Sequence, residues 1–297
     1  MHIPDGFLST PVWATLDVAA VPAVACIARR AQRGLEDARV PLLGVMGAFV
    51  FAAQMINFPV GIGTSGHLVG GALLACALGP ATASVVMCAI LAIQALVFQD
   101  GGILALGPNI INMAILGVLA GYLPFHIWGT GRRRRSAIFA GGALSVMVSA
   151  VLALAELMLS GVRIPTALLG TSLALFLVSA VVEGAITLAA VQALEAMRPG
   201  LVRQPAAGRS WALPAAGFAA VLLVAAGVLF ASAAPDGVQR LAQQAGIAAR
   251  ATALVRTPFS GYEAAFAASP WLRKAAAGFA GLAMIYGAAL LIGKRRR

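Results

Sequence analysis

Long apolar runs dominate the chain, and short segments rich in proline, glycine or arginine separate one run from the next. A helix needs about 20 apolar residues to cross the hydrocarbon of a bilayer, although shorter helices occur inside a bundle. The lengths of these runs, and the proline, glycine and arginine residues that separate them, predict about nine membrane-spanning helices. The predicted spans are Pro11–Arg30, Val40–Phe58, His67–Leu78, Pro80–Phe98, Pro108–Ile127, Ala137–Ser160, Thr166–Leu194, Trp211–Ser232 and Leu272–Gly293. We therefore expect an all-α, polytopic transmembrane helix bundle.

Basic residues gather in short clusters between these runs and after the last one. The clusters are Arg29, Arg30 and Arg33; Arg132 to Arg135; Arg198, Arg203 and Arg209; and Lys294 to Arg297. The positive-inside rule places such clusters on the cytoplasmic side of a membrane. With about nine crossings, every cluster falls on that side if the N-terminus lies outside and the C-terminus lies in the cytoplasm. We expect that topology.

Composition and charge narrow the class of protein. Hydrophobic residues make up 61% of the 297 residues and charged residues only 10%, whereas soluble domains have about 25% charged residues. A soluble globular domain is excluded, and we expect a multi-pass protein of the cell (inner) membrane. The net charge of +11 comes from clusters beside apolar runs, so we reject nucleic acid as a partner. Cys26, Cys76 and Cys88 lie inside apolar runs, where we expect them to fill the core.

The predicted helices fall into two groups. Residues 1–197 hold about seven of them, and the polar segment 198–210 follows as a cytoplasmic linker. Residues 211–297, here called the C-terminal module, then form a hairpin of two helices around an outer segment, 233–270. That outer segment is too long and too polar for a tight turn, so we expect it to fold against the outer face.

The predicted topology brings three polar segments together on the outer face: Met1–Thr10, Pro59–Gly66 and Gln99–Pro108. The cytoplasmic loops, in contrast, hold little besides arginine. The first ten residues contain no lysine or arginine, so the basic start of a cleavable signal peptide is missing. We expect the mature chain to begin at Met1 and the chemistry to lie on the outer face.

Met1 and His2 offer nitrogen atoms for chelation at consecutive positions. The terminal amine, the amide nitrogen of His2 and its imidazole Nδ1 can close a five-membered and a six-membered ring around one metal. Such a planar set of nitrogens suits Ni(II) or Cu(II), with Co(II) also possible. His67, at the mouth of a predicted span on the same face, offers a fourth nitrogen. The alternative, that His2 is an ordinary residue near a terminus, stays open on these residues alone.

Polar side chains near the outer helix ends suggest a supporting shell for this site. A metal-bound histidine usually donates its second ring N–H to a carboxylate, an amide or a backbone carbonyl. Gln94, Asp100 and Asn109 are candidates for these acceptors. The alternative is that they cap helices or bond one helix to another.

Several stretches resemble one known family. The stretches are MHIPDGFLS at the N-terminus, GTSGHLVGG around His67, AIQALVFQDGGILALGPNIINM over Ala92–Met113, and Glu183-Gly184. They are similar to the substrate-binding subunits of cobalt and nickel energy-coupling-factor (ECF) transporters, the CbiM/NikM family. The resemblance covers roughly residues 1–200. It implies that Ni(II) or Co(II), as transported substrate, is bound by the Met1 amine, the backbone and imidazole nitrogens of His2, and His67. It also implies two kinds of partner, a transmembrane coupling subunit and two cytoplasmic ATPase subunits.

The C-terminal module resembles the small two-helix partner subunit of the same systems, the PDGLE, CbiN or NikN type. The likeness rests on APDGVQRLA at Ala234–Ala242 and TPFSGYEAAF at Thr257–Phe266. This chain departs from the pattern at Val238-Gln239, where Leu-Glu is usual. The resemblance implies a role in metal loading, with Asp236 and Gly237 as contacts to the outer loops.

Two rival functions remain possible on the sequence. A secondary, ion-coupled divalent metal transporter would need ionisable residues within the membrane, and Glu156, Glu183 and Asp17 are the candidates. An intramembrane enzyme is the weaker rival, because no serine–histidine or paired-aspartate site is present. We expect a non-catalytic subunit that binds no nucleotide, with nickel slightly favoured over cobalt.

Overall fold

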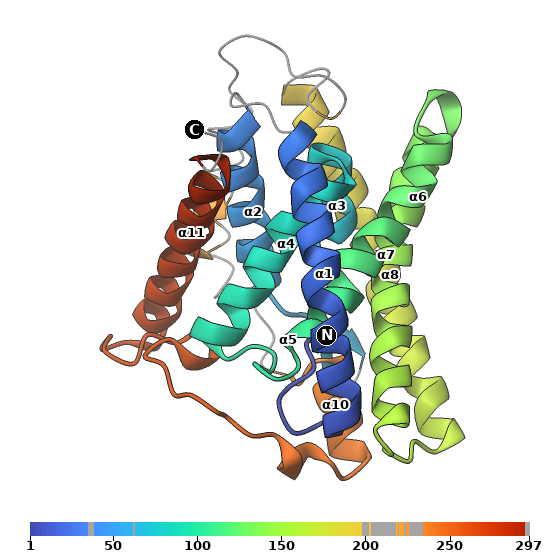
Figure 1. The fold of residues 1–297 in the computed structure, drawn as a ribbon, viewed down its shortest axis with the longest axis vertical. Coiled ribbons are helices and arrows are strands. Elements are labelled where there is room, and N and C mark those ends of the chain that lie inside the picture. Colours follow the sequence, from blue (N-terminus) through green and yellow to red (C-terminus); the bar gives the residue numbers. More distant parts are fainter. Residues whose placement is uncertain are drawn as a thin grey trace.

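The computed structural model describes residues 1–34, 39–61, 63–197 and 234–294, together with 202, 218, 220–222 and 224–225. Figure 1 shows a bundle of helices that run mostly along the long axis of the molecule. The N-terminus lies within the lower half of the bundle, and the C-terminus lies at the upper end. The predicted linker 198–210 and the predicted span Trp211–Ser232 lie largely outside the described residues.

Six helices among the described residues are long and apolar enough to cross a membrane. The helical elements that form them are α1 (Thr10–Gly34), α4 (Pro80–Ile93) with η2 (Gln94–Phe98), α5 (Leu106–Asn109) with η3 (Ile110–Gly117) and α6 (Val118–Trp128), η4 (Gly131–Arg133) with α7 (Arg134–Leu159), α8 (Thr166–Met197), and α11 (Pro270–Lys294). The expectation of a polytopic helical membrane protein is confirmed.

Two predicted spans are shorter than expected. α2 (Val40–Gln54) ends before Phe58, and α3 (Gly71–Leu78) begins four residues after His67. The start of α3 has a local cause: Gly70 has a left-handed φ of 76°, a conformation that glycine adopts without a steric penalty. The chain from His67 to Gly70 is therefore not helical, and the buried His67 lies on an irregular backbone.

A short hairpin lies at the outer end, which the all-α expectation missed. β1 (Phe58–Gly61) pairs antiparallel with β2 (Thr64–Gly66), with Phe58 opposite Gly66 and Pro59 opposite Ser65. Ser65 also forms a parallel bridge to Asp236. The C-terminal module thus adds a backbone contact to this hairpin.

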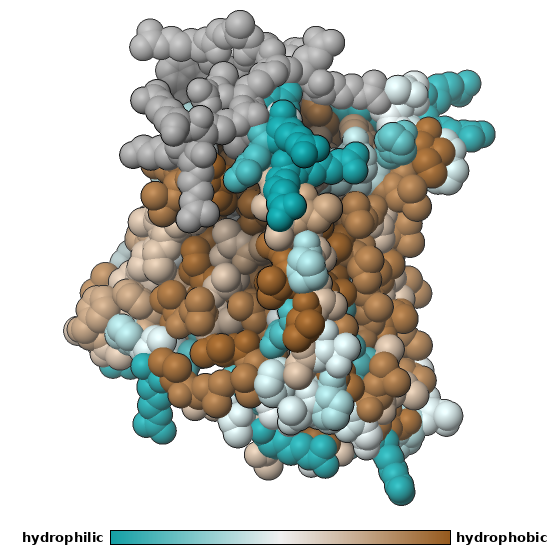
Figure 2. Space-filling model, viewed as in Figure 1, coloured by the Kyte–Doolittle hydropathy of each residue, from teal (hydrophilic) through white to brown (hydrophobic). Residues whose placement is uncertain are grey.

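The rest of the described outer segment of the module lies at the same end of the bundle. α10 (Gly237–Gln244), η5 (Ala248–Arg250) and η6 (Ser260–Tyr262) follow one another there, in orange at the lower edge of Figure 1. Figure 2 shows an apolar brown belt across the middle of one face, with hydrophilic side chains gathered toward its two ends. This distribution fits a protein whose middle lies in a bilayer.

The basic clusters that the structure describes share one end of the bundle. α1 ends near Arg29, Arg30 and Arg33, and the α6–α7 connection holds Arg132 to Arg135. Figure 1 places both of these segments, and the end of α11, at the upper end, opposite the N-terminus. This arrangement agrees with the expected topology, in which the N-terminal end faces outside.

Candidate metal centre

The N-terminal segment is buried inside the outer end of the bundle. Met1, His2 and Ile3 are exposed by only 7%, 4% and 0%. The side-chain amide of Asn109 accepts the Ile3 N–H at 2.9 Å and donates to the Ile3 carbonyl at 3.1 Å. Gly102 N–H donates to the same carbonyl at 2.9 Å. Asn109 and Gly102 therefore bind the backbone of Ile3 through hydrogen bonds, as a neighbouring strand would, and these bonds fix the positions of Met1 and His2.

Asp5 anchors the other end of this segment. Its carboxylate accepts N–H groups from Ile103, Leu104 and Ala105 at 2.9, 2.8 and 3.3 Å. A Cβ atom on Gly102 would lie 2.2 Å from Asp5 Oδ1, so only glycine allows this approach. The predicted outer loop Gln99–Pro108 and the N-terminal segment form one interlocked unit.

His67 presents one ring nitrogen to the Met1 amine. Its Nδ1 lies 2.9 Å from the Leu68 carbonyl, and a carbonyl accepts only, so Nδ1 carries the proton. Nε2 then has a free lone pair, and it lies 2.7 Å from the Met1 amine. Glu183 of α8 holds the following backbone by accepting the N–H groups of Val69 and Gly70, each at 2.8 Å.

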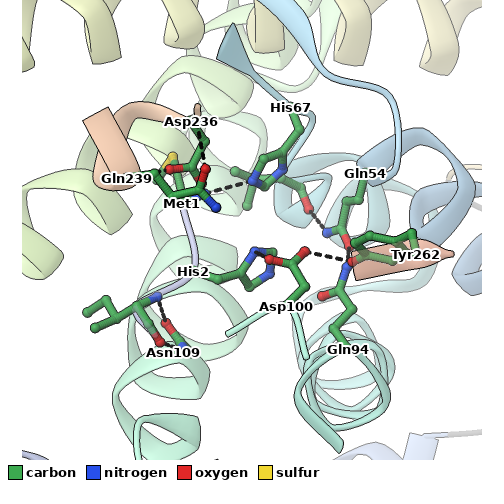
Figure 3. A network of polar contacts seen from close by, with 12 residues as sticks. Met1, His2, Gln54, His67, Gln94, Asp100, Asn109, Asp236, Gln239 and Tyr262 are labelled. Atoms are coloured by element: carbon green, nitrogen blue, oxygen red, sulfur yellow. Dashed lines mark hydrogen bonds and ion pairs between the residues drawn. The ribbon is translucent and has the colours of Figure 1, made fainter. Parts of the chain in front are cut away.

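His2 lies beside His67, and its ring nitrogens lack hydrogen-bond partners. The two imidazole rings are stacked, with centroids 5.3 Å apart and planes within 8° of each other. Neither ring nitrogen of His2 has a hydrogen-bond partner, although both are buried. Buried polar atoms in proteins are nearly always satisfied. A buried imidazole without hydrogen-bond partners, next to an amine, a second imidazole and the carboxylate of Asp100, fits a site for a cation that arrives from outside (Figure 3).

Asp100 lies beside His2 and is held by the C-terminal module. Its Oδ1 is 3.3 Å from His2 Nδ1, and its Oδ2 accepts the Tyr262 hydroxyl at 2.6 Å. Burial alone would raise the pKa of Asp100, but the neighbouring His2 outweighs it and holds this pKa below its usual range. Burial and then Asp100 raise the pKa of Tyr262, so its hydroxyl keeps its proton and donates.

Asp236 contacts the Met1 amine from the other side. The amine donates to Asp236 Oδ2 at 2.7 Å, and Asp236 Oδ1 accepts the Gln239 N–H at 2.8 Å. Gln239 also accepts the Asp236 N–H, which completes a capping box at the start of α10. Glutamine serves this role as well as the glutamate that is usual at this position of the pattern. Gly237 packs on α8, where a Cβ would lie 2.6 Å from Phe176 Cε1.

The Met1 ammonium lowers the pKa of both His67 and Asp236, which keeps the imidazole neutral and the carboxyl group ionised. Burial, followed by the nearby Met1 ammonium, lowers the pKa of His67 to about 4. Its imidazole is therefore neutral at neutral pH, the form that binds metals. Burial opposes ionisation of Asp236, but the ammonium outweighs it and lowers the pKa of this carboxyl group.

The residues predicted to support the site take different positions. Asp100 is adjacent to His2, whereas Asn109 holds the Ile3 backbone and no histidine ring. Gln94 donates to Gln54 Oε1 at 2.7 Å, and Gln54 donates to the Val69 carbonyl at 2.8 Å. Gln94 thus supports the loop after His67 from a distance. Whether these residues act on a bound metal stays a prediction.

Sequence reasoning missed three contacts of the site. The acceptor for His67 Nδ1 is the Leu68 carbonyl, which every residue type offers. Glu183 and Tyr262 are visible in the sequence as a buried acid and an outer aromatic residue, yet no pattern pairs them with Val69 or Asp100.

The arrangement provides nitrogen ligands from the main chain as well as from side chains. Among the described residues, no three His, Cys, Asp or Glu side chains form a metal-binding group. Two neighbouring nitrogens of a square-planar metal lie about 2.8 Å apart if each metal–nitrogen bond is about 2.0 Å, as for imidazole on zinc. The Met1 amine and His67 Nε2 are 2.7 Å apart. That spacing suits two adjacent ligands of one metal.

The fold and this nitrogen-rich centre fit a membrane protein that handles a transition metal. Similarity to known proteins identifies the family. Residues 2–201 match the family described as the cobalt uptake substrate-specific transmembrane region, CbiM. The chain belongs to this family. It is thus a multi-pass membrane protein of a cobalt and nickel transport family, whose members are transporters and not enzymes.

Individual relatives extend this similarity. A metal transport protein of Haloquadratum walsbyi is 39% identical over 209 residues, which cover 68% of this chain and 93% of the relative. The NikMN protein of Archaeoglobus fulgidus, named as a fused nickel transport protein, is 38% identical over 241 residues, covering 79% of this chain and 77% of the relative. That alignment is longer than the stretch 2–201, so the likeness to the fused protein continues beyond it.

A solved structure shares the fold. The crystal structure of a truncated transition metal transporter aligns with a TM-score of 0.57 and 33% identity, and covers 65% of this chain and 98% of its own. Nearly the whole of that transporter therefore corresponds to about two thirds of this chain.

Proposed function

We propose that this chain captures Ni(II) or Co(II) at the extracytoplasmic face as the substrate-binding subunit of an ATP-driven ECF-type importer. The metal is bound by the Met1 amine, the amide and imidazole nitrogens of His2, and His67 Nε2. The observation that carries this proposal is the 2.7 Å separation of the Met1 amine and His67 Nε2, beside a buried His2 with unpaired ring nitrogens.

The supporting residues act on these ligands through hydrogen bonds. Asp100 lies 3.3 Å from His2 Nδ1, the ring nitrogen that closes the chelate, and places a negative charge beside the bound cation. The Leu68 carbonyl accepts the proton of His67 Nδ1 and leaves Nε2 for the metal. Asn109 sets the register of the N-terminal segment. Asp236 and Gly237 connect the C-terminal module to this centre, where the module promotes metal loading.

Energy for transport comes from other chains in this proposal. A transmembrane coupling subunit and two cytoplasmic ATPase subunits would bind this chain, and it would bind no nucleotide itself. The purified chain should therefore bind metal without hydrolysing ATP. ATP-dependent uptake should need all the subunits, and uptake driven by an ion gradient in the chain alone would favour a secondary transporter instead.

Nickel is the favoured substrate. A plane of four nitrogens suits Ni(II), and the fused relative of Archaeoglobus fulgidus is named as a nickel transport protein. Competition between Ni(II) and Co(II) for the purified protein tests this preference directly. Tighter binding of Co(II) than of Ni(II) would contradict it.

Removal of single ligands tests the chelate. His2→Ala and His67→Ala each delete one nitrogen, and one extra residue before Met1 moves the amine away, so each change should abolish tight Ni(II) binding. His126→Ala is the matched control, because His126 lies at the far end of α6. Isothermal titration of the purified chain measures the binding. An extended chain that binds as tightly as the native one would refute the chelate.

A further inference from the structure

A carboxylate from the C-terminal module reaches the amine of Met1. The amine donates to Asp236 Oδ2 at 2.7 Å, across 235 positions of sequence. The two groups are nearly enclosed, with side-chain exposures of 7% for Met1 and 11% for Asp236. A buried charged group needs a partner, because its hydration is lost. Asp236 provides that partner to an atom that is also a proposed metal ligand.

Asp236 is itself held in place from two directions. Its Oδ1 accepts the Gln239 N–H and begins α10. Its backbone neighbours are tied to β2, since Ser65 N–H donates to the Pro235 carbonyl at 2.9 Å and Ser65 Oγ donates to the Ala234 carbonyl at 2.6 Å. β2 leads directly to His67, so the carboxylate and the imidazole are placed by the same short strand.

This arrangement fixes a group that would otherwise rotate. The Met1 amine lies between Asp236 Oδ2 and His67 Nε2, at 2.7 Å from each (Figure 3). A ligand atom held in its bound position before the metal arrives avoids the entropy cost of ordering it then. A primary amine bound to a metal still carries N–H groups, so the bond to Asp236 persists after loading.

We propose that Asp236 is a positioning residue of the metal centre, through which the C-terminal module holds the Met1 amine against His67. The inference rests on the proposed function of Met1, His2 and His67 and adds a role in affinity to the role in loading. Asp236 is not a ligand here, because both of its oxygens are engaged and carboxylates suit harder ions than Ni(II).

Two substitutions remove the ion pair with the Met1 amine while keeping the start of α10. Asn and Ser are both good N-cap residues. Asp236→Asn keeps the size but loses the charge, and Asp236→Ser is too short to reach the amine. Gln239→Ala is the matched control, since it weakens the same capping box and leaves the carboxylate in place. All are made in the full chain with a free N-terminus.

Two measurements separate positioning from a general loss of structure. Loss of such a partner typically weakens metal binding about 10- to 100-fold, so titration with Ni(II) should show that loss for both Asp236 variants and near-native binding for Gln239→Ala. The visible spectrum of the loaded site should stay unchanged, because its four nitrogens remain. In the metal-free chain, acylation of the Met1 amine should become faster in the Asp236 variants only.

The inference fails if Asp236→Asn and Asp236→Ser bind Ni(II) with native affinity. It also fails if Gln239→Ala weakens binding as much as they do, or if the spectrum of the loaded site changes. Absence of Ni(II) binding in the unaltered chain would be a different result, because it would overturn the proposed function as well.

Discussion

At the scale of single residues, Glu183 shows how a buried acid can serve a site that it does not touch. Its side chain is fully buried in α8, and its two oxygens accept two consecutive N–H groups, those of Val69 and Gly70. The backbone from His67 to Gly70 is not helical and precedes α3, so those N–H groups have no partners within a helix. Glu183 thus fixes the direction in which the chain leaves His67.

Glu183→Gln should therefore weaken metal binding without removing a ligand. Glutamine offers one acceptor oxygen, and its NH2 group would face a backbone N–H that also needs an acceptor. We expect Ni(II) binding about 10- to 100-fold weaker, by analogy with other supporting groups of metal sites, measured by isothermal titration. Thr171→Ala is the control, since Thr171 is an exposed residue of α8 that bonds within its own helix. Equal affinity in both variants would contradict this role.

The lowered pKa of His67 predicts a pH dependence of stability. Burial and the Met1 ammonium bring its pKa to about 4 from 6.5, so between these values the unfolded chain binds the proton and the folded chain does not. Protonation of His67 therefore favours the unfolded chain. The contribution of His67 to the free energy of unfolding is complete above pH 6.5 and is lost as the pH falls toward 4. NMR titration of labelled histidine in the metal-free chain should give a midpoint near 4. A midpoint above 6 would contradict the burial of this ring.

At the scale of elements, the outer segment of the module meets the metal centre at two points. Asp236, at the start of α10, contacts Met1, and Tyr262, in η6, contacts Asp100. Tyr262 also stacks on Phe98 at the end of η2, with ring centroids 4.9 Å apart and planes 16° apart. η6 is therefore held by an apolar contact and a polar one.

Tyr262→Phe should separate these two contacts. The ring stack on Phe98 is kept, while Asp100 loses the donor to one oxygen and becomes freer to move away from His2. We expect Ni(II) binding about tenfold weaker, the lower end of the range for supporting groups, with little change in thermal stability. Tyr286→Phe on α11 is the control. If Tyr262→Phe matches it in affinity, Asp100 does not depend on this hydroxyl.

The helices were predictable from the sequence because burial in lipid requires an apolar run, which is a local property. Thr166–Met197 and Pro270–Gly293 match their predicted spans closely for this reason. The hairpin at Phe58–Gly66 and the non-helical path from His67 to Gly70 were not predictable, because they are held by partners far along the chain, Pro235 and Glu183.

The site was predictable to the same limited degree. Met1, His2 and His67 could be proposed from chelate chemistry, because two of them are adjacent and the third follows from the predicted topology. The structure brings them together with Asp100 and Asp236. The contacts of Gln94 and Asn109 differ from the expected ones, since an amide side chain bonds equally well to a backbone or to a ring and no pattern distinguishes the two.

At the scale of the whole molecule, about a third of the chain lies outside the part that corresponds to a truncated transition metal transporter of known structure. The transition metal transporter of known structure aligns over 98% of its own length with 65% of this chain. The described polar contacts between residues 234–270 and the rest of the outer end involve Met1, Ser65, Asp5, Val97 and Asp100. α11 of the same module packs closely on α2, where a Cβ atom on Gly281 would lie 2.1 Å from the Phe51 ring. The module therefore joins the bundle both at the outer end and along a membrane-spanning helix.

Truncation after Arg209 should leave a chain that inserts into the membrane but no longer supports uptake. Its loaded site should show the native metal spectrum, because Met1, His2 and His67 remain. Uptake of radioactive nickel in cells that contain the other subunits, at equal membrane abundance, measures the loss. The full-length chain with the single substitution Asp236→Asn is the intermediate control, because it keeps the module and changes only this residue. Undiminished uptake by the truncated chain would rule out a role of the module in loading.

The contact between Met1 and Asp236 also bears on how the protein is made. Synthesis proceeds from the N-terminus, so Met1 exists before any of the groups that surround it. Asn109 follows 106 positions after Ile3, and Asp236 follows 235 positions after Met1. Contacts between residues so distant in sequence form late, because a long loop must close first. Met1 can therefore reach its final contacts only after Asp236 has been made and the helices between them have been inserted.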